Sequence, residues 1–197
     1  IKCISKSHPL QSQFRLEADL LMNLSHPSIP VLYDFWEDAD NLYLIEEYVA
    51  GESLGQYMLY HDHISQEYIM QLGIRLCGVL EYLHSRQPYP VYYRDLKPEH
   101  IILCGDLVKI IDFGIASYQT GREEKFQHYG TIGYAAPEQY TDLLPTPATD
   151  LYALGKVLEQ LLKKSDGSRH LKQIVRKTLE PEPDRRYLCA AALKKDL

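Results

Sequence analysis

The chain has 197 residues, of which 45% are hydrophobic and 24% charged, with a net charge of −6. These values are ordinary for a soluble globular protein of one large or two small domains. The acidic balance argues against a nucleic-acid-binding protein, which is normally basic. No apolar run approaches the roughly 18 residues of a membrane span.

The four cysteines are scattered along the chain and form no C-x-x-C pair. Apolar neighbours at Cys77 and Cys104 indicate buried thiols rather than a metal site or disulfides. We therefore expect a reducing compartment, the cytoplasm. The first residues resemble a strand entered midway, so we also expect this chain to be a piece of a longer protein.

Apolar spacing and turn residues predict the elements of the first part of the chain. In order they are a strand over residues 1–5, a helix over 12–25, two hairpin strands over 31–37 and 42–47, and a connector at 49–51. The prolines of "HPSIP" end the helix, because proline cannot continue one.

The second part is predicted to be mainly helical. A helix capped by Ser65 comes first, then short strands over 101–103 and 108–111, and then three helices that include Leu151–Leu161, Leu171–Leu179 and the C-terminal "CAAALKK". Residues 112–138 show no sustained period, and a loop of that length is usually functional. Segregated strands and helices predict an α+β fold with a boundary near residues 49–52.

Four motifs occur in one order: "YYRDLKPEH", "IIDFG", "YAAPEQ" and "DLYALG". Alone, a charged cluster before a strand is usually a solvated turn. Together, the series resembles the catalytic core of eukaryotic-type (Hanks-type) Ser/Thr protein kinases, in a form similar to bacterial members. The resemblance implies a two-lobed fold, with residues 1–48 as a partial strand-rich lobe and residues 49–197 as a mainly helical lobe.

The resemblance implies roles for three charged residues. Asp95 matches the aspartate that orients the substrate hydroxyl and accepts its proton, and Lys97 would place a cation near the transferred phosphate. Asp112 matches the carboxylate that holds Mg²⁺ against the phosphates of ATP, since Mg²⁺ prefers oxygen ligands.

Further positions match the nucleotide pocket of the family. Lys2 resembles the lysine that meets the α- and β-phosphates, and Glu17 its partner on the next helix. The backbone of Glu47 and Val49 would bond the adenine edge, and Ile102 would pack beneath it. Each could also be an ordinary surface or core residue when taken alone.

Two nearby features depart from or qualify this match. Glu46 falls at a position on the back wall of the pocket that is commonly apolar, so its carboxylate needs a donor or water. His100 stands where the family has asparagine, a second metal ligand, and imidazole suits softer metals than Mg²⁺. His100 could coordinate Mn²⁺ or bond the backbone of Asp95.

The glycine-rich phosphate loop of the family is absent from this sequence, and we expect it upstream of Ile1.

Residues 112–138 match the activation loop of the family. Arg94 implies a loop ordered by a phosphate, and the candidate acceptors are Ser117, Thr120 and Tyr129. The resemblance also implies that Thr131 contacts Asp95 and Lys97. Glu138 is expected to pair with Arg186, or with its neighbour Arg185. An apolar column anchored by Asp150 is expected to contain Leu21, Leu32, Tyr93 and Phe113.

The leading prediction is a protein kinase that transfers the γ-phosphate of ATP to a protein Ser or Thr hydroxyl. The first alternative is a pseudokinase, a non-enzymatic module that binds a nucleotide or a protein, favoured by His100 and the short linker at residues 163–168. The second is a small-molecule kinase, which "AAPEQ" and its arginine partner disfavour. Substrate and oligomeric state are open.

Overall fold

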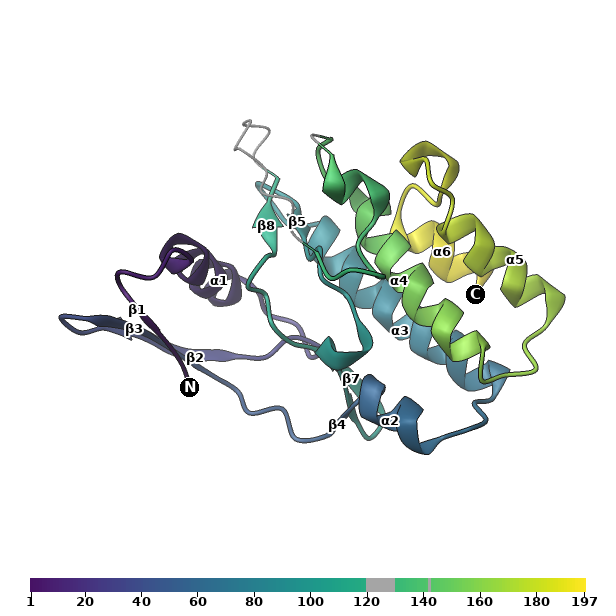
Figure 1. Ribbon diagram of the computed structural model, residues 1–197, viewed down its shortest axis with the longest axis horizontal. Helices are drawn as coiled ribbons and strands as arrows, with labels where there is room; N and C mark the ends of the chain where they lie inside the picture. Colours follow the sequence, from purple (N-terminus) through teal and green to yellow (C-terminus); the bar gives the residue numbers. More distant parts are fainter. Residues whose placement is uncertain (120–129, 142) are drawn as a thin grey trace.

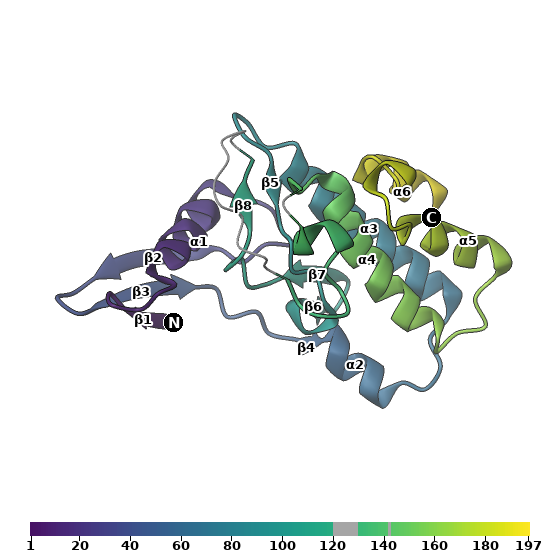
Figure 2. The same cartoon turned by 45° about the horizontal axis from the view of Figure 1, so that its top comes forward.

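The computed structural model describes residues 1–119, 130–141 and 143–197. Strands and one helix occupy one end of the molecule and the remaining helices the other (Figure 1). Short strands lie between the two ends (Figures 1 and 2). The predicted α+β arrangement, with strands first and helices afterwards, is confirmed in the described residues.

The strand-rich end is a three-stranded antiparallel sheet in the order β1-β3-β2. Its elements are β1 (Lys2–Ser5), α1 (Gln11–Asn23), β2 (Leu32–Glu37) and β3 (Asn41–Glu46). α1 lies against this sheet and buries Phe14, Ala18 and Leu21, which recur at helical spacing.

The helical end is built around the long helix α3, which contacts both α4 and α6. Its helices are α2 (Leu54–Tyr60), α3 (Gln66–His84), α4 (Pro147–Leu162), α5 (Arg169–Thr178) and α6 (Ala190–Asp196). Leucines of α3 and α4 that are at most 3% exposed form the core between them. This apolar packing gives the segments that carry the candidate catalytic residues a rigid base.

Between the two ends lie two small antiparallel sheets, β4-β6-β7 and β5-β8. Their strands are β4 (Glu52–Ser53), β5 (Val91–Tyr92), β6 (Ile101–Cys104), β7 (Leu107–Ile110) and β8 (Ser117–Tyr118). Short 3₁₀ turns are η1 (Pro98–His100), η2 (Pro137–Tyr140) and η3 (Pro183–Arg185). The candidate catalytic residues lie where β5 ends and around the β6-β7 hairpin.

Sequence patterns predicted the long helices, the strands of the three-stranded sheet, the β6-β7 hairpin and α6, but not α2, β4, β5 or β8. The Ser65 hydroxyl accepts a hydrogen bond from the Tyr68 backbone, so the predicted cap is confirmed. α2 was not predicted, because seven residues are too few to show a helical period. Its signal was a capping box, in which Ser53 and Gln56 each bond the other's backbone.

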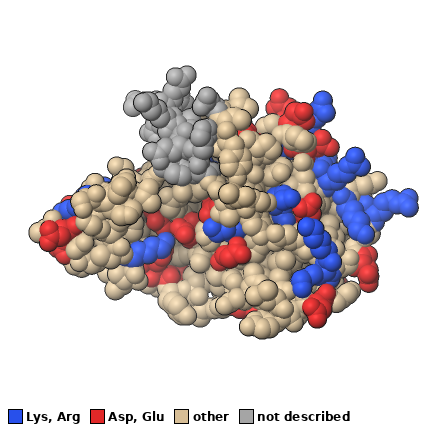
Figure 3. All heavy atoms as spheres, viewed as in Figure 1, with Lys and Arg blue, Asp and Glu red and all other residues tan. Residues whose placement is uncertain are grey.

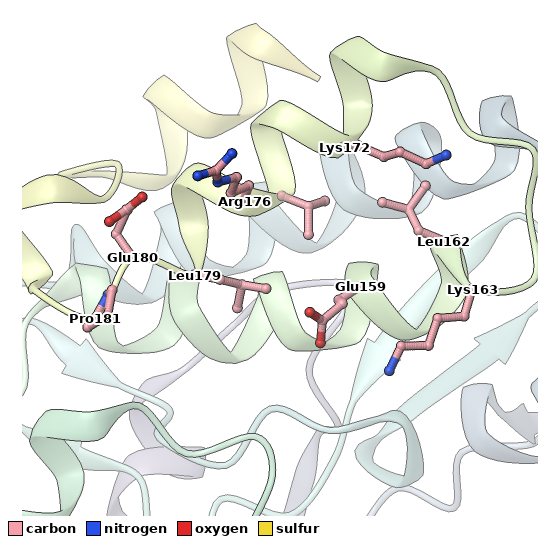
Figure 4. Close-up of a pocket in the computed structure, with 9 residues that line it drawn as sticks. Glu159, Leu162, Lys163, Lys172, Arg176, Leu179, Glu180 and Pro181 are labelled. Atoms are coloured by element: carbon pink, nitrogen blue, oxygen red, sulfur yellow. The ribbon is translucent and has the colours of Figure 1, made fainter.

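The surface bears acidic and basic side chains interspersed, with Lys and Arg side chains gathered toward the α5 end (Figure 3). α4 and α5 enclose an open groove of about 480 Å³ beside the short linker at residues 163–168. Figure 4 shows Leu162 between Lys172 and Lys163, and Leu179 between Glu180 and Glu159. In the described part of the chain, no helix combines the length and apolarity needed to cross a membrane.

Candidate active site

Asp95 follows the short strand β5 and is held by two neighbours. Thr131 donates its hydroxyl to Asp95 Oδ1 at 2.6 Å, and the Lys97 ammonium lies 3.1 Å from Asp95 Oδ2. Lys97 also donates to the Thr131 hydroxyl at 2.9 Å. The three side chains form a closed triangle, in which one carboxylate is fixed by a cation and a hydroxyl.

Asp112 follows the strand β7, and its carboxylate lies near Lys2 and His100. Its φ angle is +66°, a conformation that few residues other than glycine adopt. The Gly114 backbone N–H donates to Asp112 Oδ1 at 3.2 Å, which helps to hold the carboxylate in this orientation. The Asp112 side chain is half exposed, so its oxygens are accessible from solvent.

His100 lies between the two aspartates. Its Nδ1 is 3.5 Å from Asp95 Oδ2, and its Nε2 is 3.6 Å from Asp112 Oδ2. One imidazole ring therefore spans the distance between the carboxylates. Asp95 and Asp112, 17 positions apart in the sequence, face a single site.

The surroundings of His100 fix which nitrogen carries its proton. Nδ1 lies 3.2 Å from both the Asp95 carbonyl and the Tyr93 hydroxyl, and Tyr93 donates its own proton to the Ile111 carbonyl. Nδ1–H is thus the donor, and Nε2 presents a lone pair to Asp112. Burial, aided by the Lys97 charge, lowers the pKa of His100 and favours the neutral ring.

This donor set fits a divalent cation. A neutral Nε2 and a carboxylate 3.6 Å apart both present lone pairs, so a cation between them would relieve their repulsion. The described residues contain no group of three or more potential metal-ligating side chains. Such a sparse set fits a metal site in which phosphates and water supply the remaining ligands.

Lys2 lies at the centre of a second charged cluster. Its ammonium is 2.6 Å from Glu17 Oε1, 3.3 Å from Glu46 Oε1 and 3.9 Å from Asp112 Oδ1. Burial opposes the charge of Lys2, but the carboxylates of Glu17, Glu46 and Asp112 together outweigh it and raise the pKa of Lys2. Burial raises the pKa of Glu17, and Lys2 partly offsets that shift. The partly buried carboxylate of Glu46 therefore lies beside a cation, the Lys2 ammonium.

Residues 47–51 connect the two ends of the molecule beside Ile102. A Cβ atom placed on Gly51 would come within 2.2 Å of the Leu103 carbonyl oxygen and 2.9 Å of Ile102 Cγ2. The connector therefore runs directly against β6. The Glu47 backbone N–H donates to Val31, whereas neither the Glu47 carbonyl nor the Val49 N–H takes part in a backbone bond within the described connector.

The Glu47 side chain has a role that the sequence did not indicate. Its two carboxylate oxygens lie 2.7 and 2.6 Å from the Lys109 ammonium on β7. The hydrogen bond from Lys109 lowers the pKa of Glu47. The ion pair ties the connector to the β6-β7 hairpin, and its only sequence signal was a lysine in an otherwise apolar strand.

Asp150 on α4 organises the segment that leads into Asp95. Its buried carboxylate accepts the backbone N–H groups of Tyr93 at 2.9 Å and Arg94 at 2.7 Å, and contacts His84 Nε2 at 2.9 Å. These bonds stabilise the φ angle of +70° at Arg94. The predicted anchoring by Asp150 is confirmed, and His84 is a further contact that the sequence did not indicate.

The expected apolar column is only partly tested by the contacts. The Tyr93 and Phe113 rings meet edge to face, with centroids 5.1 Å apart, and both residues are 1% exposed. Leu21 is buried, while Leu32 is partly buried against the same core. Tyr93 and Phe113 therefore link the Asp95 segment to the Asp112 segment by direct packing.

A buried ion pair joins the "APEQ" turn to the chain after α5. Glu138 pairs with Arg186 through two contacts of 2.8 Å, and the Thr149 hydroxyl donates to the same carboxylate. Arg185, the competing candidate, is 70% exposed and lies near Glu182 instead. The prediction of Arg186 as the partner of Glu138 is confirmed.

The structure describes one of the three candidate phosphate acceptors. Ser117 lies in β8, and its hydroxyl is 3.4 Å from the Arg94 guanidinium. Thr120 and Tyr129 lie outside the described residues. The assignment of an activating phosphate therefore stays a prediction.

Comparison with known proteins identifies the family. A family model described as the protein kinase domain matches residues 1–177. The chain is 32% identical over 154 residues to the serine/threonine-protein kinase PrkC of Bacillus subtilis, which covers 76% of the chain and 23% of that relative. It is 32% identical over 174 residues to the serine/threonine-protein kinase ULK1 of Homo sapiens, covering 82% of the chain and 16% of that relative.

The chain spans less than a quarter of the length of these two relatives. Because they come from a bacterium and from human, a bacterial origin stays a prediction. The matches confirm the family and the kinase fold that the four motifs predicted. The chain belongs to the protein kinase domain family.

Proposed function

We propose that this chain is the catalytic part of a serine/threonine kinase, which transfers the γ-phosphate of ATP to a protein hydroxyl. The observation that carries this proposal is that Asp95 and Asp112 lie on either side of one imidazole ring, His100. Serine/threonine kinases among the relatives support the same reaction. The acceptor would be the side chain of a protein substrate.

In this proposal Asp95 orients the acceptor hydroxyl and takes its proton as the oxygen–phosphorus bond forms. The bond from the γ-phosphorus to the bridging oxygen breaks, and ADP leaves with that electron pair. Lys97 stabilises the negative charge on the transferred group, and it is already held 3.1 Å from Asp95. Thr131 keeps both side chains in place through its hydroxyl.

Nucleotide binding would use the cluster around Lys2 and the connector. Lys2, oriented by Glu17, would contact the phosphates, as its counterpart does in the family. The Glu47 carbonyl and the Val49 N–H would meet the adenine edge, with Ile102 beneath it. These assignments agree with the position of Gly51 against β6, which brings the connector close to Ile102.

Asp112 and His100 would hold the metal, which would neutralise phosphate charge and orient the γ-phosphate. We propose Mg²⁺ as the usual ion because Asp112 is an oxygen ligand. Mn²⁺ is the alternative, since it accepts an imidazole nitrogen more readily than Mg²⁺ does.

We further propose that residues 1–48 and 49–197 act as the two lobes of this kinase, with the nucleotide between them. All four cysteines are free thiols, which supports a reducing location such as the cytoplasm. The net charge of −6 makes a nucleic-acid partner an unfavourable assignment.

A second candidate function is a pseudokinase that binds a nucleotide or a protein without transfer. The observation that favours it is His100, which replaces an oxygen ligand by a nitrogen at the metal site. Under this alternative the Lys2 cluster would still bind phosphates, but no acceptor would be phosphorylated.

The test is to incubate the full-length protein with γ-labelled ATP, casein as a general acceptor, and either Mg²⁺ or Mn²⁺. We expect labelled phosphoserine or phosphothreonine, and we expect Asp95→Ala to abolish the label. Absence of transfer with either metal, in both the wild type and His100→Asn, would instead favour the binding module. Label found on a small alcohol and not on protein would favour a small-molecule kinase.

A further inference from the structure

Two carboxylates contact Lys2 from different elements. Glu17 reaches it from α1 at 2.6 Å, and Glu46 reaches it from the end of β3 at 3.3 Å. Lys2 pairs with Leu44 in the β1-β3 ladder, so Glu46, two residues further along β3, projects from the same sheet face. The register of the sheet thus fixes the contact between Lys2 and Glu46.

The cluster contains three carboxylates and one ammonium, so negative charge is in excess around Lys2. Glu17 makes the shorter contact and is the more buried partner, with its side chain 5% exposed against 19% for Glu46. Asp112 adds a third carboxylate at 3.9 Å. Glu46 therefore contributes surplus negative charge in a partly buried region, where charges are screened less than on an open surface.

We propose that Glu46 is a positioning residue that draws Lys2 toward the end of β3 and weakens its binding of the phosphates of ATP. This inference rests on the proposed function, in which Lys2 contacts those phosphates. Glu46 competes with them for one ammonium and also repels them directly. Its effect therefore applies to a charged nucleotide and not to an uncharged nucleoside.

The test is calorimetric titration of the full-length protein with ATP and, separately, with adenosine, at one fixed Mg²⁺ concentration. Glu46→Gln removes the charge and keeps the shape, and we expect it to bind ATP roughly three- to tenfold more tightly. Adenosine affinity should not change. Glu46→Met removes the same charge in an apolar shape and should shift ATP affinity in the same direction.

A matched control is Glu37→Gln, which removes one carboxylate from the neighbouring strand β2. Glu37 is an exposed residue that pairs with Arg15 at 2.6 Å and Lys6 at 3.2 Å. We expect its ATP affinity to equal that of the wild type.

The outcomes separate this inference from the proposed function. If the wild type binds ATP and both Glu46 variants leave that affinity unchanged or weaker, the inference is wrong and the proposed function stands. An equal gain in adenosine affinity also overturns it, because the effect would then concern pocket shape. If the wild type binds no ATP, both proposals fail.

Discussion

At the scale of single residues, the site depends on how each charged group is held. Asp95 is fixed by Lys97 and Thr131, whereas Asp112 is fixed by its own strained backbone and the Gly114 N–H. His100 connects the two and presents an unprotonated nitrogen toward Asp112. If His100 and Asp112 hold the metal as proposed, the choice of metal depends on the His100 side chain.

Replacing His100 by asparagine should change that preference. The amide offers an oxygen ligand, so we expect the ratio of activity in Mg²⁺ to activity in Mn²⁺ to rise roughly fivefold or more. The measurement is kcat/KM for ATP in each metal with a common protein acceptor. An unchanged ratio would show that His100 does not contact the metal.

At the scale of elements, short contacts between distant segments hold the site together. Glu138 and Arg186 join the "APEQ" turn to the region after α5, and Lys109 joins β7 to the connector. Gly51 lets the connector pass against β6. These contacts make the catalytic loops depend on the packing of elements that carry no chemistry.

Arg186→Ala should strongly destabilise the protein. It would leave the Glu138 carboxylate buried without its cation, and breaking such a pair costs about 3–5 kcal/mol. The free energy of unfolding in urea measures this cost, with Arg185→Ala as the matched control. Arg185 is 70% exposed, so its replacement should change stability by less than about 0.5 kcal/mol. Equal losses for the two variants would refute the assignment.

Two glycines should respond in opposite directions to an added methyl group. Gly51→Ala places a Cβ 2.2 Å from the Leu103 carbonyl oxygen and should destabilise by about 1–3 kcal/mol. Gly78→Ala in α3 meets nothing within 4 Å and should stabilise by about 0.5–1 kcal/mol, because alanine favours a helix. Urea unfolding of both variants is the check, and a stable Gly51→Ala would mean that the connector does not lie tightly against β6.

At the scale of the whole molecule, the sequence predicted the family, the order of the elements and the motif residues. It did so because motifs and long apolar periods are local signals. It did not predict that Glu46 contacts Lys2 or that Lys109 holds Glu47, since those pairs depend on strand register and on how distant segments meet. The proton position on His100 likewise depends on Tyr93 and the Asp95 backbone.

The proposed reaction requires the strand-rich and helical ends to present their charged groups to one site. Lys2 and Glu17 come from the first end, Asp95 and Asp112 from the second, and Lys2 reaches within 3.9 Å of Asp112. We therefore expect substitutions to separate nucleotide binding from phosphate transfer, because the proposed function assigns the two steps to different residues.

The most direct test is the single-turnover rate of phosphate transfer by Asp95→Asn at saturating ATP and metal, compared with the wild type. We expect the variant to bind ATP normally and to transfer phosphate roughly 10²–10⁴ times more slowly, because it has lost its general base. Transfer at the wild-type rate would contradict the account, since the reaction would then not depend on the carboxylate of Asp95.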